Sequence, residues 1–241
     1  MLYLIGLGLN IEGISRFGFE ILQRCKRVYL ENYTVDFPYT IGELQEVIFQ
    51  GKTKKLLLAN REKVESLELV DEAKKMDVAL LIYGSPLSAT THISLIEEAK
   101  KTKVKYKVIH AGSIFDAVAE TGLQQYKFGK VTSMPAWKKN FEPTSFMKIV
   151  EENISINAHS LILIDIGLDF QNALEQLEIS AKEYNITLNK LIVCQTLGTK
   201  SQKIHYKEIE ELKEYNGIKK PYCIIIPSKL HFIEEEMLKE I

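Results

Sequence analysis

Small and hydroxyl-bearing residues follow a strongly apolar run in the first half of the chain. The run Val78–Tyr83 predicts a buried strand, and it breaks at Gly84-Ser85-Pro86 into a segment that contains Ser88, Thr90 and Thr91. A helical pattern begins at Ile93. The start of a helix has unpaired backbone N–H groups that favour a carboxylate or phosphate group of a ligand. The same residues can instead form only a turn and a helix cap, and the local sequence leaves both interpretations open.

Two further glycine turns follow apolar segments. Gly6-Leu7-Gly8-Leu9 ends the first of these segments, and Gly112-Ser113-Ile114 comes soon after residues 106–110. Ligands of open α/β sheets bind at the carboxyl ends of the strands. Because small residues let a ligand lie against the backbone, the three turns predict a cofactor recognised by main-chain groups and apolar contacts.

Other chemistries fit the sequence less well. Gly6 and Gly8 match two positions of a dinucleotide fingerprint, and Glu31 is spaced like its ribose-binding acid, but the third glycine is replaced by Ile11. A branched side chain there would crowd a pyrophosphate. The chain has no P-loop string and no GxSxG, and its histidines lack the spacing of metal ligands. These histidines are His92, His110, His159, His205 and His231. We therefore expect no metal site and no hydrolase nucleophile.

Composition limits the class of protein and its partners. The chain has 241 residues, 46% of them hydrophobic, and a formal net charge of -1, so we expect a globular protein without a nucleic-acid or membrane partner. Its three cysteines are far apart and lie in or beside apolar runs, which is typical of reduced, buried thiols in a cytoplasmic protein. The apolar N-terminus has no basic flank, and no window is long enough for a membrane span.

The alternation of strands and helices predicts an α/β fold with a parallel sheet. In the first part we expect strands at 2–7, 27–31, 55–58, 78–83 and 106–110, with helices at 14–25, 40–48, 61–75 and from 93. In the second part we expect strands at 131–134, 160–166, 191–196 and 222–227, with helices at 144–157, 170–183, 206–214 and at the end. The glycine-bounded segment 122–130 interrupts this rhythm. We divide the chain into two α/β lobes, 1–112 and 113–241, with a cleft between them as the expected site.

Several sequence blocks together resemble one family. They are Leu4-Ile5-Gly6-Leu7-Gly8-Leu9, Val28-Tyr29-Leu30-Glu31 with Tyr33-Thr34, Gly84-x-Pro86-Leu87-x-Ala89-Thr90-Thr91-His92, Gly112-Ser113-Ile114, Glu120-Thr121-Gly122-Leu123-Gln124, Tyr126-Lys127-Phe128-Gly129-Lys130 and Lys229-Leu230-His231. Over essentially its whole length the chain resembles the diphthine synthases, of the tetrapyrrole methylase-like class of S-adenosylmethionine methyltransferases. The Thr-Thr-His and Glu-Thr-Gly-Leu-Gln blocks are specific to this family, whereas the glycine turns are shared by the wider class.

The resemblance implies a two-lobed α/β homodimer that binds S-adenosylmethionine in the cleft between the lobes. It also implies a protein substrate, the modified histidine of translation elongation factor 2, whose 3-amino-3-carboxypropyl group is methylated on its amine. Carried over by position, the cofactor contacts are Leu9, Ser85, Ser88, Ser113, Ile114, Ile164, Tyr206 and His231. The last three rest on a looser alignment. The position of Tyr206 contacts the cofactor largely through backbone, and we interpret His231 as a cofactor contact rather than a base, so no catalytic residue is assigned.

One position departs from the family pattern. The family usually has Gly-Asp-Pro in the central turn, and this chain has Ser85 in place of the acid. A neutral hydroxyl forms weaker hydrogen bonds to a charged ligand than a carboxylate does, so we expect weaker cofactor binding with activity retained. Two alternatives stay open: a methyltransferase of the same class acting on a tetrapyrrole or other small molecule, and a binding protein that has lost turnover.

Overall fold

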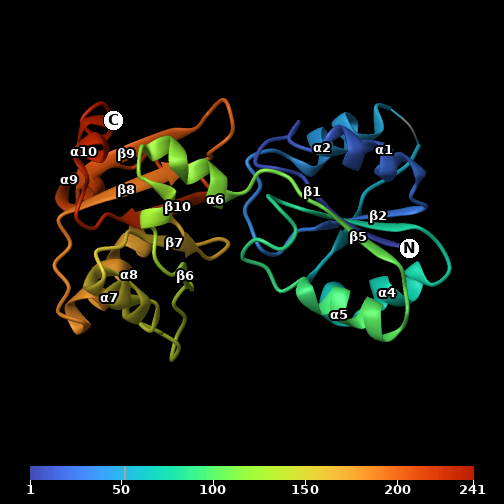
Figure 1. The fold of residues 1–241 in the computed structure, drawn as a ribbon, viewed down its shortest axis with the longest axis horizontal. Helices are drawn as coiled ribbons and strands as arrows, with labels where there is room; N and C mark the ends of the chain where they lie inside the picture. The colour runs from blue at the N-terminus through green and yellow to red at the C-terminus, as the bar shows by residue number, and fades with distance from the viewer. Residues whose placement is uncertain (52) are drawn as a thin grey trace. The chain divides into compact units, whose positions relative to one another are not determined.

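The computed structural model describes residues 1–51 and 53–241 and divides the chain into two compact units, Met1–Asp116 and Ala117–Ile241. Each unit has its own sheet, with helices packed against it (Figure 1), so the predicted α/β class is confirmed. The first unit extends beyond residue 112, where we placed the division. Its last turn is closed locally, because Oδ2 of Asp116 accepts hydrogen bonds from Ser113 N at 2.7 Å and Ser113 Oγ at 2.9 Å.

The sheet of the first unit is entirely parallel, as predicted. Its strands are β1 (Leu2–Gly6), β2 (Arg27–Glu31), β3 (Leu57–Ala59), β4 (Val78–Ile82) and β5 (Tyr106–Ile109). They lie in the order β3-β2-β4-β1-β5. Every residue of β4 is buried, which is expected of a parallel strand covered on both faces. This order makes β4 and β5 the two neighbours of β1, so the loops that follow these three strands leave the same edge of the sheet.

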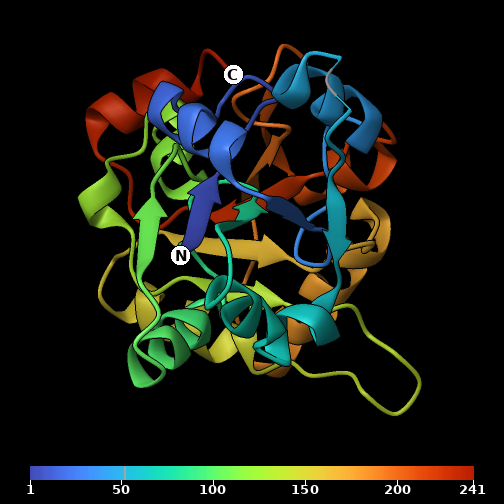
Figure 2. The same cartoon turned by 90° about the vertical axis from the view of Figure 1, so that its right-hand side faces the viewer.

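Helices cover both faces of this first sheet. They are α1 (Arg16–Arg24), α2 (Ile41–Phe49), α3 (Arg61–Glu65), α4 (Glu68–Ala73) and α5 (Ile93–Lys101), and the short α6 (Ile114–Ala117) crosses the division between the units. Figures 1 and 2 show α1 and α2 on one face and α4 and α5 on the other. Two buried clusters correspond to these layers, one with Leu22 and Leu44 and the other with Leu69 and Leu95.

The structure corrects one local prediction in the first unit and decides one open interpretation. The single helix expected at 61–75 is two helices, because Leu67 has a φ of 63° in the left-handed region and breaks the hydrogen-bond ladder. Of the two interpretations left open for the hydroxyl residues before α5, the helix cap is not realised, since the N-cap residue is His92 and makes no side-chain cap bond. The Thr90 hydroxyl instead donates to the carbonyl of Pro86 at 2.7 Å and so stiffens the preceding turn.

The second unit has a mixed sheet rather than the parallel one that we expected. Its strands are β6 (Thr132–Met134), β7 (Ser160–Ile164), β8 (Lys190–Gln195), β9 (Lys203–Glu208) and β10 (Tyr222–Ile226), in the order β6-β7-β10-β8-β9. Among the described strands of this unit, β6 and β7 pair in parallel, while β10 runs antiparallel to β7 and β8, and β9 runs antiparallel to β8. The helix predicted at 206–214 is wrong in its first part. Residues 203–208 form β9 because they pair with the whole length of β8.

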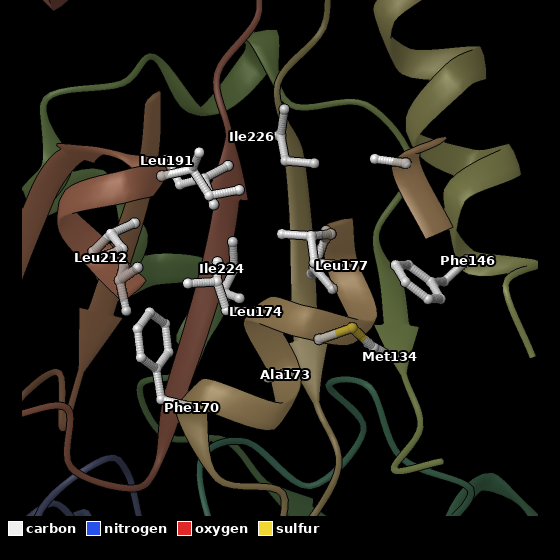
Figure 3. Packing of buried hydrophobic residues seen from close by; sticks show 14 of the residues in the cluster. Met134, Phe146, Phe170, Ala173, Leu174, Leu177, Leu191, Leu212, Ile224 and Ile226 are labelled. Atoms are coloured by element: carbon white, nitrogen blue, oxygen red, sulfur yellow. The ribbon is translucent and has the colours of Figure 1, made fainter. Parts of the chain in front are cut away.

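The helices of the second unit are α7 (Phe146–Ser155), α8 (Phe170–Glu183), α9 (Ile209–Glu214) and α10 (Phe232–Leu238), with 3₁₀ turns η1 (Val118–Thr121) and η2 (Gln125–Lys127). Figure 3 shows the main core, in which Leu174 and Leu177 of α8 lie against Ile224 of β10. The ring of Phe170 meets that of Tyr222 edge-on at 5.6 Å. This core holds α8 on one face of the sheet and orients the strand ends of the unit.

The described residues include three buried, unpaired cysteines. Cys25, Cys194 and Cys223 are free and buried, as predicted. Cys194 and Cys223 are direct partners across β8 and β10. Within residues 1–51 and 53–241, no helix has both the length and the apolar character needed to cross a lipid bilayer.

Candidate active site

The first two glycine turns are joined by backbone hydrogen bonds. Gly8 N donates to Gly84 O at 3.1 Å, and Gly84 N donates to Gly8 O at 2.9 Å. Both glycines have positive φ, 69° for Gly8 and 70° for Gly84. This conformation lets the two turns approach each other without a side chain between them. The turns that follow β1 and β4 therefore form one continuous piece of backbone at the carboxyl edge of the sheet.

The third turn packs against the same place. A Cβ atom on Gly6 would lie 2.6 Å from Gly84 O and 2.9 Å from the Cβ of Ala111, so only glycine fits there. A Cβ on Gly84 would lie 3.9 Å from the Cα of Ser113. The turns after β1, β4 and β5 therefore converge, as the sequence predicted for a ligand recognised by backbone.

A side chain on Gly112 would enter open space. No heavy atom of the described residues lies within 4 Å of the position that its Cβ would occupy, and its φ is not in the left-handed region. Neither packing nor backbone conformation in this structure therefore requires a glycine. A molecule lying against the backbone of this turn would require one, which makes the convergence of the turns a suitable place for a ligand.

Leu9 is held through its carbonyl group. The hydroxyl of Tyr83, next to the end of β4, donates to Leu9 O at 2.9 Å. The Tyr83 ring meets that of Phe37 edge-on at 5.6 Å and lies near that of Tyr39 at 6.5 Å. Burial raises the pKa of Tyr83, so its hydroxyl stays protonated and continues to donate. The aromatic cluster thus fixes the loop that carries Leu9.

The serines predicted in the other two turns are also placed by local bonds. Ser85 is only 7% exposed, and its Oγ lies 3.2 Å from Nδ1 of His110. Ser88 N donates to Ser85 O at 3.0 Å. The bonds that Ser113 donates to Asp116 lower the pKa of that carboxyl group. The structure therefore brings together the five predicted residues of the first unit, Leu9, Ser85, Ser88, Ser113 and Ile114.

Glu31 is buried and bonded to the loop that follows β2. It is 1% exposed, and its carboxylate accepts hydrogen bonds from Tyr33 N at 2.7 Å, Thr34 N at 2.9 Å and Thr34 Oγ1 at 2.6 Å. These three bonds close the loop after β2 and engage both oxygens. Glu31 therefore has a structural role in this loop. Among residues 1–51 and 53–241, no three potential metal ligands gather into one cluster.

The predicted residues of the second unit lie in two places. Tyr206 lines a cavity of about 330 Å³, where Lys190 Nζ is 5.1 Å from the centre of its ring. The other lining residues come from the loop before β8 and from the ends of β9 and β10: Thr187, Leu188, Asn189, Glu208, Ile226, Pro227, Ser228 and Leu230. His231 follows Leu230 directly and is the N-cap residue of α10.

Ile164 lies at the opposite end of the same sheet. In the pairing of β7 with β10, Ser160 is opposite Ile226, which lines the cavity, whereas Ile164 lies beyond the pair Leu163 and Cys223. Its side chain packs against the main hydrophobic core of the unit. Within this unit the structure therefore does not bring Ile164 together with Tyr206 and His231.

A buried carboxylate that the sequence analysis did not single out positions His231. Glu234 is fully buried, and its two oxygens accept from His231 N at 2.7 Å, Gln124 N at 3.0 Å, His159 Nε2 at 3.3 Å and the Lys127 ammonium group. Burial alone would raise the pKa of Glu234, but these bonds outweigh it and lower the pKa to about 2. His231 and Glu234 form a capping box, and only its glutamate matches the usual sequence signal, since the first position is a histidine rather than Ser or Thr.

His159 and Lys127 connect this carboxylate to the preceding loop. Ser228 N donates to Nδ1 of His159 at 3.0 Å, so the ring proton lies on Nε2 and is donated to Glu234. Burial lowers the pKa of His159, although the carboxylate opposes this, and the ring is held neutral. Lys127 Nζ also donates to Lys229 O at 2.9 Å. The Glu234 network, defined as Gln124, Lys127, His159, His231 and Glu234, therefore ties three sequence blocks together.

Known proteins are similar to this chain in sequence and in fold, some of them over nearly their whole length. The family model described as tetrapyrrole (corrin/porphyrin) methylases matches residues 1–213. A diphthine synthase from Methanocaldococcus jannaschii is 37% identical over 99% of this chain and 98% of its own length. A diphthine methyl ester synthase from Schizosaccharomyces pombe is 40% identical over 71% of this chain and 60% of its own length. A crystal structure of diphthine synthase superposes with a TM-score of 0.89 and 29% identity, covering 99% of this chain and 94% of the other.

Proposed function

The chain belongs to the tetrapyrrole methylase family and to its diphthine synthase members, and we propose that it methylates the modified histidine of elongation factor 2 with S-adenosylmethionine. The acceptor is the amine of the 3-amino-3-carboxypropyl group on that histidine. The observation that carries the proposal is the convergence of three glycine turns around the open backbone at Gly112, in a chain that matches diphthine synthases from end to end.

The residues at the turns fit such a cofactor. Its amino-acid part carries an ammonium and a carboxylate group, and Ser85 offers a hydroxyl at the tip of β4. The backbone of the turn at Gly112 has room for a flat or extended group to lie against it. Leu9 and Ile114 supply the apolar contacts. Within the second unit, the predicted contact Tyr206 lines a cavity of about 330 Å³ of its own, a volume within the range of small-molecule sites.

Methyl transfer from S-adenosylmethionine needs few catalytic side chains. When bound, S-adenosylmethionine supplies a methyl group on a sulfonium, which is already a good leaving group. The protein must align the acceptor amine with that methyl group and exclude water. The acceptor amine must be unprotonated to attack the methyl group, and at neutral pH a minor fraction of such an amine is free base. Accordingly, we assign no catalytic residue.

Mass spectrometry of the protein substrate tests the function directly. Elongation factor 2 carrying the aminocarboxypropyl histidine is incubated with the chain and with methyl-labelled S-adenosylmethionine, and the peptide that contains the histidine is analysed. Label on the aminocarboxypropyl group is expected, and the number of labels gives the number of methyl groups added. If the chain binds the cofactor but leaves the factor unlabelled, a small-molecule acceptor or a binding function replaces this proposal. If it binds no cofactor at millimolar concentration, the methyltransferase proposal fails.

A second acceptor atom is favoured by one relative. The protein from Schizosaccharomyces pombe is named for a methyl ester, and it is 40% identical over 71% of this chain. A methyl group on the carboxylate of the same substrate would be released by mild alkali, whereas methyl groups on the amine would stay. Alkali treatment of the labelled peptide therefore separates the two acceptors. Complete retention of label would restrict this chain to the amine.

We further propose that the chain works as a homodimer in the cytoplasm. Support comes from its three free, buried thiols, which are typical of a reducing compartment, and from the resemblance to a dimeric family. A net charge of -1 offers no general attraction to nucleic acid or to an anionic membrane. Light scattering after size-exclusion chromatography measures the mass in solution, and a value of one chain at micromolar concentration would contradict the dimer.

Ser85 stands where the family usually has an aspartate, and we expect this difference to weaken cofactor binding. A carboxylate forms a charge-assisted bond to an ammonium group that is roughly twice as strong as a neutral bond. Titration of S-adenosylmethionine into the Ser85→Asp variant should therefore show about tenfold tighter binding than to the wild-type chain. Equal affinity of the two proteins would show that the departure has no consequence for the cofactor.

A further inference from the structure

A hydrogen bond joins Ser85, in the turn after β4, to His110, directly after β5. Ser85 Oγ lies 3.2 Å from His110 Nδ1. Ser85 follows β4 and His110 follows β5, and only β1 separates these two strands. Ser85 is 7% exposed, whereas His110 is an exposed residue. The imidazole therefore reaches from the rim of the sheet edge toward a buried hydroxyl.

We propose that His110 is a positioning residue that orients the Ser85 hydroxyl toward the ammonium group of the cofactor. This inference rests on the proposed function, because it takes Ser85 as a cofactor contact. Nδ1 of a neutral imidazole accepts the single hydroxyl proton, and both lone pairs of Oγ are then free to accept from a ligand. In the tautomer that this bond requires, the ring proton lies on Nε2.

The need for such a partner follows from the chemistry of serine. A carboxylate is an acceptor in every orientation, so an acid at this position would need no orienting group. A hydroxyl rotates freely, and in some orientations it presents its proton to the ammonium group, which repels it. A hydrogen bond to His110 removes those orientations and polarises the oxygen in the favourable direction.

Other polar groups of the turns do not serve this purpose. The Ser113 hydroxyl donates to Asp116 Oδ2 at 2.9 Å, and Ser113 N donates to the same oxygen at 2.7 Å. The carbonyl of Leu9 already accepts from Tyr83 at 2.9 Å. Both groups are thus held by partners on their own side of the site. The hydroxyl of Ser85, by contrast, is hydrogen-bonded to His110.

A double-mutant cycle tests whether His110 acts through Ser85. Titration calorimetry measures the affinity for S-adenosylmethionine of the wild-type chain, His110→Ala, Ser85→Ala and the double variant. Each single substitution is expected to weaken binding about tenfold, the typical size of one hydrogen bond to a charged group. The double variant should bind no more weakly than Ser85→Ala, because His110 has no remaining group to orient.

Two further measurements separate orientation from a structural role. The His110→Asn variant keeps an acceptor oxygen and should recover part of the lost affinity, while the melting temperature should stay unchanged because His110 is exposed. Methylthioadenosine lacks the amino-acid part of the cofactor, and its affinity should not change in any variant. The inference would be overturned if the double variant bound S-adenosylmethionine about tenfold more weakly than Ser85→Ala. It would also be overturned if His110→Ala bound the cofactor as tightly as the wild-type chain. Absence of binding to the wild-type chain would instead overturn the proposed function, and this inference with it.

Discussion

Replacement of Glu234 by Gln is expected to destabilise the second unit in a pH-dependent manner. The carboxylate accepts from four donors, and the pKa of Glu234 is about 2 against an ordinary value of 4.5. A difference of this size corresponds to ~3 kcal/mol of stability at neutral pH. Glutamine has one acceptor oxygen in place of two, so its NH₂ group would face donors of the network. We expect the variant to lose about 2 to 3 kcal/mol at pH 7.

The sign of the pH dependence follows from the lowered pKa. At a pH above the unfolded pKa of 4.5, the native and unfolded chains are both ionised at Glu234, and the full contribution is present. As the pH falls toward about 2, the unfolded chain binds a proton that the native chain does not, and the contribution is lost. The stability difference between wild type and Glu234→Gln should therefore shrink to about half by pH 3.

Urea unfolding at several pH values measures this difference. Glu235→Gln is the matched control, because Glu235 also lies in the first turn of α10 but is exposed. It removes the same charge near the helix start, an interaction worth about 0.3 to 1 kcal/mol, without touching the network. Equal losses in the two variants, or a difference for Glu234→Gln that does not vary between pH 7 and pH 3, would refute the network as the source of stability.

Four other substitutions test the remaining parts of the structure. Gly112→Ala should leave the melting temperature unchanged and weaken cofactor binding at least tenfold, because its Cβ enters open space that we assign to the ligand. Gly6→Ala should cost about 1 to 3 kcal/mol of stability in urea unfolding, since its Cβ would lie 2.6 Å from a carbonyl oxygen. Tyr83→Phe removes the donor to Leu9 and should cost about 1 kcal/mol, and an unchanged unfolding midpoint would contradict that bond. Leu177→Ala leaves a cavity in the core of the second unit and should lower the free energy of unfolding by about 2 to 5 kcal/mol. A loss below about 1 kcal/mol would show that neighbouring side chains fill the cavity.

Local patterns were sufficient for most of the secondary structure. Strand β2 and helix α8 have the expected bounds, because their apolar residues recur with the period of a strand and of a helix. The errors occur where contacts override local preference. Residues 206–208 look helical together with residues 209–214, yet they complete a strand that pairs with β8. Leu67 adopts a left-handed conformation that its residue type does not signal.

The sequence by itself determined the α/β class, the positions of the three glycine turns and the family, since runs of apolar residues, glycines and shared blocks are local properties of the chain. Only the tertiary structure decided how the turns meet, because Gly8 and Gly84 become partners through a strand order that places β4 beside β1. It also decided the Glu234 network, in which Gln124 and Glu234 are 110 residues apart. Bonds between such distant residues depend on which strands and helices pack together, and that choice is made by the burial of the whole core rather than by any short segment.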